Sequence, residues 1–137
     1  MKAYLFIVMI SISFLGYSQY STTTFNLSGN WSVPTNWSNG IPTATTNVII
    51  GLGNTLTVDA NGECRNMNLY LGSLVINTGV TLTVNGDLSV STSRTNTNNG
   101  TIVLKGGVKP LVGPNVMTVS GSVTLASGLT FPDFSID

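Results

Sequence analysis

A short pattern that recurs along the chain constrains its fold more than any other feature. Residues 81–90 read TLTVNGDLSV, and residues 116–125 repeat that plan as VMTVSGSVTL, with two alternating runs around a glycine turn. Residues 55–58 carry the same TLTV as residues 81–84, and residues 47–50 return at the same spacing as residues 73–76. Strict alternation over a short run is typical of a half-buried strand. Self-similarity at a fixed period predicts a solenoid, in which successive coils stack and bury one another.

The repeats predict an all-β fold, a right-handed parallel β-helix of about three coils with three short strands in each. Helices are not expected, because β-branched residues and glycines recur throughout and no helical spacing of apolar residues is sustained. The predicted strands are residues 47–50, 55–58 and 66–71, then 73–76, 81–84 and 87–90, then 101–104, 116–119 and 122–125. Two loops, residues 92–99 and 106–115, are expected to lengthen the third coil.

Side chains alternate along a strand, so the larger apolar residues are expected to face the core. The predicted inward residues are Val48, Leu74 and Ile102; Ile50, Ile76 and Leu104; Leu56, Leu82 and Met117; Val58, Val84 and Val119; Leu88 and Val123; Val90 and Leu125; and Leu69 and Leu71. The same register places Ile49, Val75 and Val103 in one outward column. A contiguous apolar stripe usually has a cover or a partner, so these three residues are candidates for a protein contact.

The first residues predict export. Lys2 precedes an apolar run over residues 3–15, and the small residues Gly16 and Ser18 follow it. This is the pattern of a secretory signal peptide, with cleavage expected after Ser18. The mature chain is expected to be secreted or held at the cell surface, with no membrane insertion after cleavage, because the sequence has no second apolar run of spanning length.

Three regions are therefore predicted. The boundaries are a signal peptide at 1–18, an irregular N-terminal cap or lead-in at 19–46, and β-helix repeats at 47–137. The final residues, 131–137, resemble the start of another element, so the repeats are expected to be truncated at the C-terminus.

Few charged or catalytic side chains are present, and this limits the function classes. Five Lys or Arg, five Asp or Glu and no His give no electrostatic footprint for nucleic acid and no histidine for acid–base catalysis. Cys64, the single cysteine, lies in Gly62-Glu63-Cys64-Arg65 with no histidine to serve as its base, so it is expected to be a buried apolar residue rather than a nucleophile. Asp59 falls level with Asn85 and Ser120, so no acidic column for calcium forms. We predict no enzyme activity, no cofactor and no metal site.

Two tryptophans stand in the lead-in, each in an Asn-Trp-Ser triplet. If exposed, Trp31 and Trp37 would form a stacking platform for sugar rings, as in a carbohydrate-binding module. If buried, they would cover the apolar end and the unpaired edge of the first coil. The second interpretation is favoured because an open coil end needs large apolar residues.

Threonines form the other candidate ligand surface. In the predicted register Thr55 and Thr57 stack under Thr81 and Thr83. Such Thr-x-Thr ranks are found on the flat ice-binding faces of some β-solenoids, but threonine is also an ordinary outward strand residue. Ice binding is therefore the more distant alternative.

Residues 37–76 contain a tryptophan, a proline turn and a Val-Ile strand, then a Gly-led strand ending in Val-Asp, then Leu-x-Ile and Gly-x-Leu steps. The residues of this pattern are Trp37, Gly40, Pro42, Val48, Ile49, Ile50, Gly53, Thr57, Val58, Asp59, Leu69, Gly72, Leu74 and Ile76. The pattern resembles the opening of secreted right-handed β-helix surface proteins, in particular the eight-glycine domain and its adhesin-like bacterial relatives. The resemblance implies extracellular display, and often adhesion or glycan contact.

The predicted function is that of a non-catalytic, secreted or cell-surface β-solenoid module with a structural or adhesive role. Its expected partners are extracellular glycans or other surface proteins. The alternatives are a carbohydrate-binding module with Trp31 and Trp37 as its platform, an ice-binding surface, and a fragment of a polysaccharide lyase.

Overall fold

The computed structural model describes residues 20–70, 72–91, 95–112, 115–119, 122–125 and 134–135. The predicted signal peptide, residues 1–18, lies outside the described residues and stays a prediction. Side chains are not described for residues 91, 108–112, 115–119, 123, 125 and 134–135. The described chain is all-β apart from one short 3-10 helix, η1 (Pro34–Asn36).

The strands form three sheets in which every neighbouring pair is parallel. Sheet A contains β1 (Thr22–Phe25), β3 (Asn47–Ile50), β6 (Met67–Leu69), β9 (Leu88–Ser91) and β12 (Val108–Val112). Sheet B contains β2 (Gly29–Asn30), β4 (Thr55–Val58), β7 (Ser73–Ile76), β10 (Asn96–Asn98), β13 (Asn115–Val119) and β15 (Phe134–Ser135). Sheet C contains β5 (Gly62–Cys64), β8 (Thr81–Val84), β11 (Thr101–Leu104) and β14 (Ser122–Leu125).

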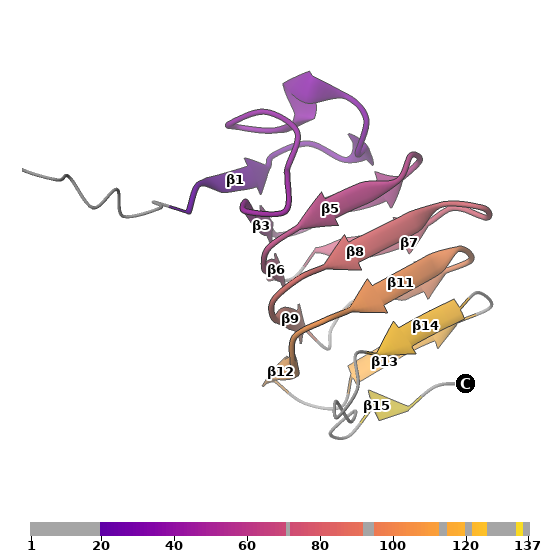
Figure 1. The fold of residues 1–137 in the computed structure, drawn as a ribbon. Helices are drawn as coiled ribbons and strands as arrows, with labels where there is room; N and C mark the ends of the chain where they lie inside the picture. The colour runs from indigo at the N-terminus through magenta and orange to yellow at the C-terminus, as the bar shows by residue number, and fades with distance from the viewer. Residues whose placement is uncertain are drawn as a thin grey trace, which may run out of the picture.

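From β3 to β14 the chain runs through sheets A, B and C in that order four times. Successive passes lie one above another, as the column of β5, β8, β11 and β14 shows (Figure 1). The predicted all-β character with parallel sheets is therefore confirmed, and it is consistent with a solenoid-like fold. The predicted count of about three coils is too low, because β5, β10 and β12 were assigned to connections or loops.

The predicted register is also wrong. In neighbouring passes Leu56 pairs with Leu74, and Ile76 pairs with Asn98, so one coil is shorter than the step from residue 55 to residue 81. That longer step leads instead from one sheet to the next, and the TLTV of β4 lies in sheet B while that of β8 lies in sheet C. The step from residue 55 to residue 81 is an even number of positions. A register based on it therefore assigns inward and outward residues correctly but pairs each residue with the wrong partner in the next coil.

The predicted inward-facing residues are accordingly confirmed, although the predicted stacking of these residues into columns is wrong. Every predicted core residue whose side chain is described is buried: Val48, Ile50, Leu56, Val58, Leu69, Leu74, Ile76, Leu82, Val84, Leu88, Val90, Ile102 and Leu104. The other predicted core residues, Leu71, Met117, Val119, Val123 and Leu125, lie outside the described side chains. Val48, Leu74 and Ile102 face inward from three different sheets rather than stacking on one another.

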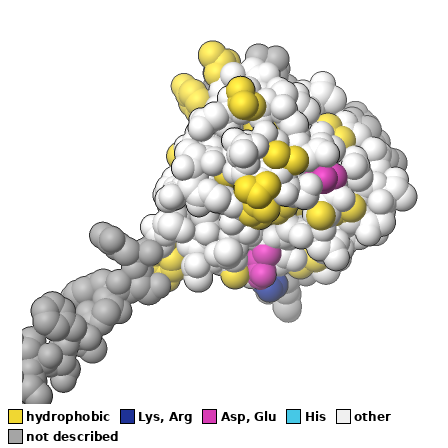
Figure 2. Space-filling model, turned by 90° about the horizontal axis from the view of Figure 1, so that it is seen from above, with side chains coloured by type: hydrophobic (Ala, Val, Ile, Leu, Met, Phe, Trp, Pro, Cys, Tyr) yellow, Lys and Arg dark blue, Asp and Glu magenta, His cyan; other side chains and the backbone are white. Residues whose placement is uncertain are grey.

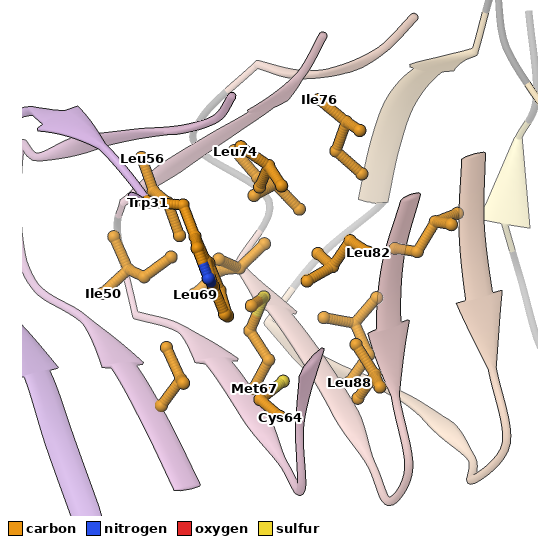
Figure 3. Close-up of a cluster of buried hydrophobic side chains, with 14 of the residues drawn as sticks. Trp31, Ile50, Leu56, Cys64, Met67, Leu69, Leu74, Ile76, Leu82 and Leu88 are labelled. Carbon is orange, nitrogen blue, oxygen red and sulfur yellow. The ribbon is translucent and has the colours of Figure 1, made fainter. Parts of the chain in front are cut away.

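The true columns follow the parallel ladders. On sheet A, Val48 lies beside Met67 and Met67 beside Leu88, while on sheet C Leu82 lies beside Ile102. Met67, Leu82 and Leu88 point into one interior between the sheets (Figure 3), and Val48 and Ile102 belong to the same buried cluster. Each fully buried aliphatic side chain contributes about 1.5–3 kcal/mol of gross burial free energy before conformational entropy is subtracted.

Two asparagines occupy inward positions of β10 and are fully buried. Asn96 Oδ1 accepts a hydrogen bond from the Leu74 N–H at 2.9 Å, and Asn98 Nδ2 donates to the Ser122 carbonyl at 3.0 Å. The Asn98 Oδ1 atom also accepts from the Gly100 N–H at 3.1 Å. Three of the four amide atoms therefore bond to backbone groups of the same and neighbouring coils, while the buried Asn96 Nδ2 atom has no hydrogen-bond partner among the described residues.

Glycine is required where the chain turns from sheet C to sheet A. A Cβ atom on Gly106 would collide with the backbone of Gly86, and a Cβ atom on Gly86 would collide with the Asn66 side chain. The turns of successive coils thus pack backbone against backbone at this corner. The predicted glycine turn at Gly86 is present, and close approach is what requires glycine there.

We expect Leu82→Ala to lower the free energy of unfolding by about 2–5 kcal/mol, because it leaves a cavity in the interior. Thr83→Ala, on the next residue of β8, is the matched control and should change stability by less than about 0.5 kcal/mol, since its side chain faces outward. Urea denaturation of both variants measures the difference. Equal losses would contradict the inward assignment.

Candidate functional site

The lead-in forms an aromatic cap made of Phe25, Trp31 and Trp37. Trp31 is 2% exposed and Trp37 is 5% exposed. The ring centroids of Trp31 and Trp37 lie 5.0 Å apart at an interplanar angle of 74°, and those of Phe25 and Trp37 lie 4.9 Å apart at 60°. Trp37 Nε1 donates a 2.9 Å hydrogen bond to the Trp31 carbonyl. Neither indole therefore offers an open face to a sugar ring, and Trp31 reaches the interior beside Leu56 and Leu69 (Figure 3).

Polar contacts fasten the aromatic cap to the stack. Ser32 Oγ donates to Asp59 Oδ2 at 2.6 Å, and the Ser32 N–H donates to Asp59 Oδ1 at 3.0 Å. Burial raises the pKa of the Asp59 carboxyl group, but the hydrogen bonds from Ser32 outweigh burial and hold that pKa below its usual value. Across the edge of β1, the Ser38 N–H donates to the Thr24 carbonyl at 3.0 Å.

The candidate threonine array does not form as expected. Thr55 and Thr57 lie on β4, where they pair with Ser73 and Val75 of β7. Thr81 and Thr83 lie on β8 in another sheet, where they pair with Thr101 and Val103 of β11. The predicted stacking of the two Thr-x-Thr ranks is therefore wrong, because the step from residue 55 to residue 81 changes sheet.

The same change of sheet removes the predicted apolar stripe. Ile49 lies on sheet A between Thr24 and Asn68. Val75 lies on sheet B and Val103 on sheet C. The three candidate contact residues thus stand on different faces, each among polar neighbours.

Charged side chains gather instead where the chain passes from sheet C to sheet A. We call this place the polar corner and define it by Glu63, Arg65, Asp87 and Lys105. Asp59 is the only charged residue outside the polar corner among those whose side chains the structure describes. Seen from the capped end, acidic and basic side chains meet at one edge of the molecule (Figure 2).

Amide side chains link successive coils at the polar corner. Asn66 Nδ2 donates to Asn47 Oδ1 at 2.9 Å, the Asp87 N–H donates to Asn66 Oδ1 at 2.8 Å, and the Gly107 N–H donates to Asp87 Oδ1 at 3.1 Å. These bonds form one row across the coils, and a second row lies at the same corner. Asn85 Nδ2 donates to Glu63 Oε1 at 2.9 Å, and Lys105 Nζ donates to Asn85 Oδ1 at 2.9 Å.

A cleft of about 460 Å³ opens at the polar corner. Its lining residues are Tyr20, Ala44, Arg65, Asn66, Asn85, Gly86 and Asp87. The Arg65 guanidinium lies over the Tyr20 ring, 3.5 Å from the ring centroid, which is cation–π geometry. Sequence reasoning missed this cluster because its members are far apart along the chain, and only the correct coil length brings Arg65, Asn85 and Lys105 together.

A larger hollow of about 670 Å³ lies between the loop of residues 41–44 and sheet C. The loop contributes Ile41, Pro42 and Ala44, and the sheet contributes Thr81 and Thr83 among others. Glu63 is its one charged lining residue, whereas both Arg65 and Asp87 line the cleft at the polar corner.

Cys64 is fully buried on the inward face of β5. Burial, together with the neighbouring Glu63 charge, raises the pKa of its thiol to about 12. The thiol therefore stays protonated near neutral pH, and its expected place as a buried apolar residue is confirmed.

No family model, curated protein or solved structure matches this chain. Within the described residues, no group of three or more His, Cys, Asp or Glu side chains could hold a metal ion. The described part also contains no helix long and apolar enough to cross a membrane.

The Cys64 thiol is expected to resist a disulfide reagent in the folded protein and to react once the chain unfolds, because the thiolate is the reacting form. Since the folded pKa is raised above the unfolded value of 9.0, the contribution of this group to stability is full below pH 9.0 and is lost as pH rises towards about 12. Unfolding free energies from about pH 8 to about pH 11 should therefore fall more steeply for the wild type than for Cys64→Ala. A folded thiol that reacts as fast as free cysteine would contradict the burial.

Proposed function

We propose that the chain is a non-catalytic, secreted or cell-surface module with a structural and adhesive role, built as a right-handed parallel β-helix. Support for the fold comes from the repeated passage through three parallel sheets and from the strong right-handed preference of parallel crossovers. The resemblance of residues 37–76 to secreted β-helix surface proteins supports the location.

The aromatic cap is the observation that carries this proposal. A parallel stack ends in unpaired backbone groups that invite association with other chains, and native proteins cover such edges. Here the lead-in places Trp31 and Trp37 over the first coil. Trp37 and Ser38 also pair with the free edge of β1. The two tryptophans thus have a structural role in the stack, which supports a structural role for the module.

The other functions receive less support. A carbohydrate-binding platform of Trp31 and Trp37 would need exposed rings, and both are buried. Ice binding was inferred from ranks of threonines that lie on separate sheets.

Trp37→Ala tests the proposal. If Trp37 is structural, this variant should lose about 3–5 kcal/mol of stability, because it empties a buried aromatic site. Thermal denaturation measures the loss, with Tyr70→Ala as the control, since Tyr70 is 59% exposed and should tolerate truncation. A glycan array probed with both variants should show unchanged specificity at a temperature where both are folded. Loss of glycan binding by Trp37→Ala without loss of stability would instead support the carbohydrate platform.

A further inference from the structure

We propose that the cleft at the polar corner binds a carboxylate-bearing saccharide, such as a uronate unit of an extracellular polysaccharide, with Arg65 as its main contact. The inference rests on the adhesive part of the proposed function and names its ligand class. Two observations carry it: the concentration of charge at this one corner, and a guanidinium that has hydrogen-bond donors to spare.

Arg65 is oriented but not neutralised. Its guanidinium lies over the Tyr20 ring, while no carboxylate among the described residues forms an ion pair with it and no described oxygen accepts a hydrogen bond from its guanidinium. A guanidinium carries five N–H donors in a planar fork that matches a carboxylate in a bidentate arrangement. Since no described acceptor takes these donors, a carboxylate can approach in the plane of the guanidinium.

The surrounding side chains are held in place before any ligand binds. The amides of Asn66 and Asn85 bond to groups of neighbouring coils, and Lys105 is held against Asn85. Lys105 has two further N–H donors on its ammonium group. Because these groups stand on backbone turns that pack closely at Gly86 and Gly106, little backbone conformational entropy remains to be lost on binding.

The mixture of charges favours a saccharide over an acidic peptide. Glu63 and Asp87 lie at the same corner as the two cations, so a ligand whose side chains present carboxylates alone would meet repulsion as well as attraction. A uronate unit presents one carboxylate among hydroxyl groups. Its hydroxyls can donate to carboxylate oxygens, while its carboxylate takes the Arg65 donors.

Calorimetric titration of the secreted chain with trigalacturonate tests the proposal, with galactotriose as the neutral probe. We expect saturable binding of trigalacturonate, little or no binding of galactotriose, and at least about tenfold weaker trigalacturonate binding by Arg65→Gln, since a charge-assisted hydrogen bond is lost. Lys105→Gln should weaken binding by a smaller factor. Thr78→Glu changes net charge by the same amount as Arg65→Gln, but in an exposed turn between β7 and β8, and should bind as the wild type does.

Several results would overturn the proposal: no saturable binding by the folded wild type, equal binding by Arg65→Gln, or an equal loss in Thr78→Glu. Equal affinity for galactotriose would also overturn it, and a glutamate oligopeptide that binds more tightly than trigalacturonate would identify a peptide site instead. Thermal denaturation checks that each variant is folded. If Arg65→Gln is not folded, Lys105→Gln is compared with the wild type instead. None of these results bears on Trp37→Ala, so failure here leaves the structural role standing.

Discussion

Backbone hydrogen bonding between parallel strands one coil apart is the constraint on which the rest of this structure depends. Such pairing holds neighbouring strands about 4.8 Å apart, so every side chain stands directly beside its partner in the next coil. Apolar columns such as Val48, Met67 and Leu88 follow on the inside. At the corner the same spacing leaves no room for a side chain between Gly86 and Gly106. On the outside, like charges stacked in successive coils would repel one another. The row of Glu63, Asn85 and Lys105 avoids this, because the Asn85 amide lies between the carboxylate and the ammonium group and bonds to both.

A stack of this kind is stable along its length but exposed at its ends. The lead-in addresses one end by adding β1 and β2 to two of the sheets and by burying three aromatic rings above the first coil. Asp59 then ties the cap to the corner after β4 through Ser32. The cap is thus an extension of the stack, and the same residues cannot also present an open aromatic platform.

Much of the fold could be predicted from the sequence because alternation survives any even shift. Leu56 and Leu82 were correctly assigned to the interior although they belong to different sheets. The coil length could not be predicted, because β10 contributes buried asparagines and β12 contains Pro110, both of which are typical of loops. The polar corner could not be predicted for the same reason. Arg65 and Lys105 become neighbours of Asn85 only in the shorter coil that pairs β8 with β11.

The register is the central claim, and methyl–methyl nuclear Overhauser effects test it most directly. Outward residues on different sheets cannot approach one another, so they report the register without ambiguity. In the structure Thr83 lies beside Val103 on sheet C, while Thr57 lies on sheet B. The account predicts a strong effect between the methyl groups of Thr83 and Val103 and none between those of Thr83 and Thr57. A strong effect between Thr83 and Thr57 would restore the longer coil expected from the two TLTV runs and contradict the stacking described above.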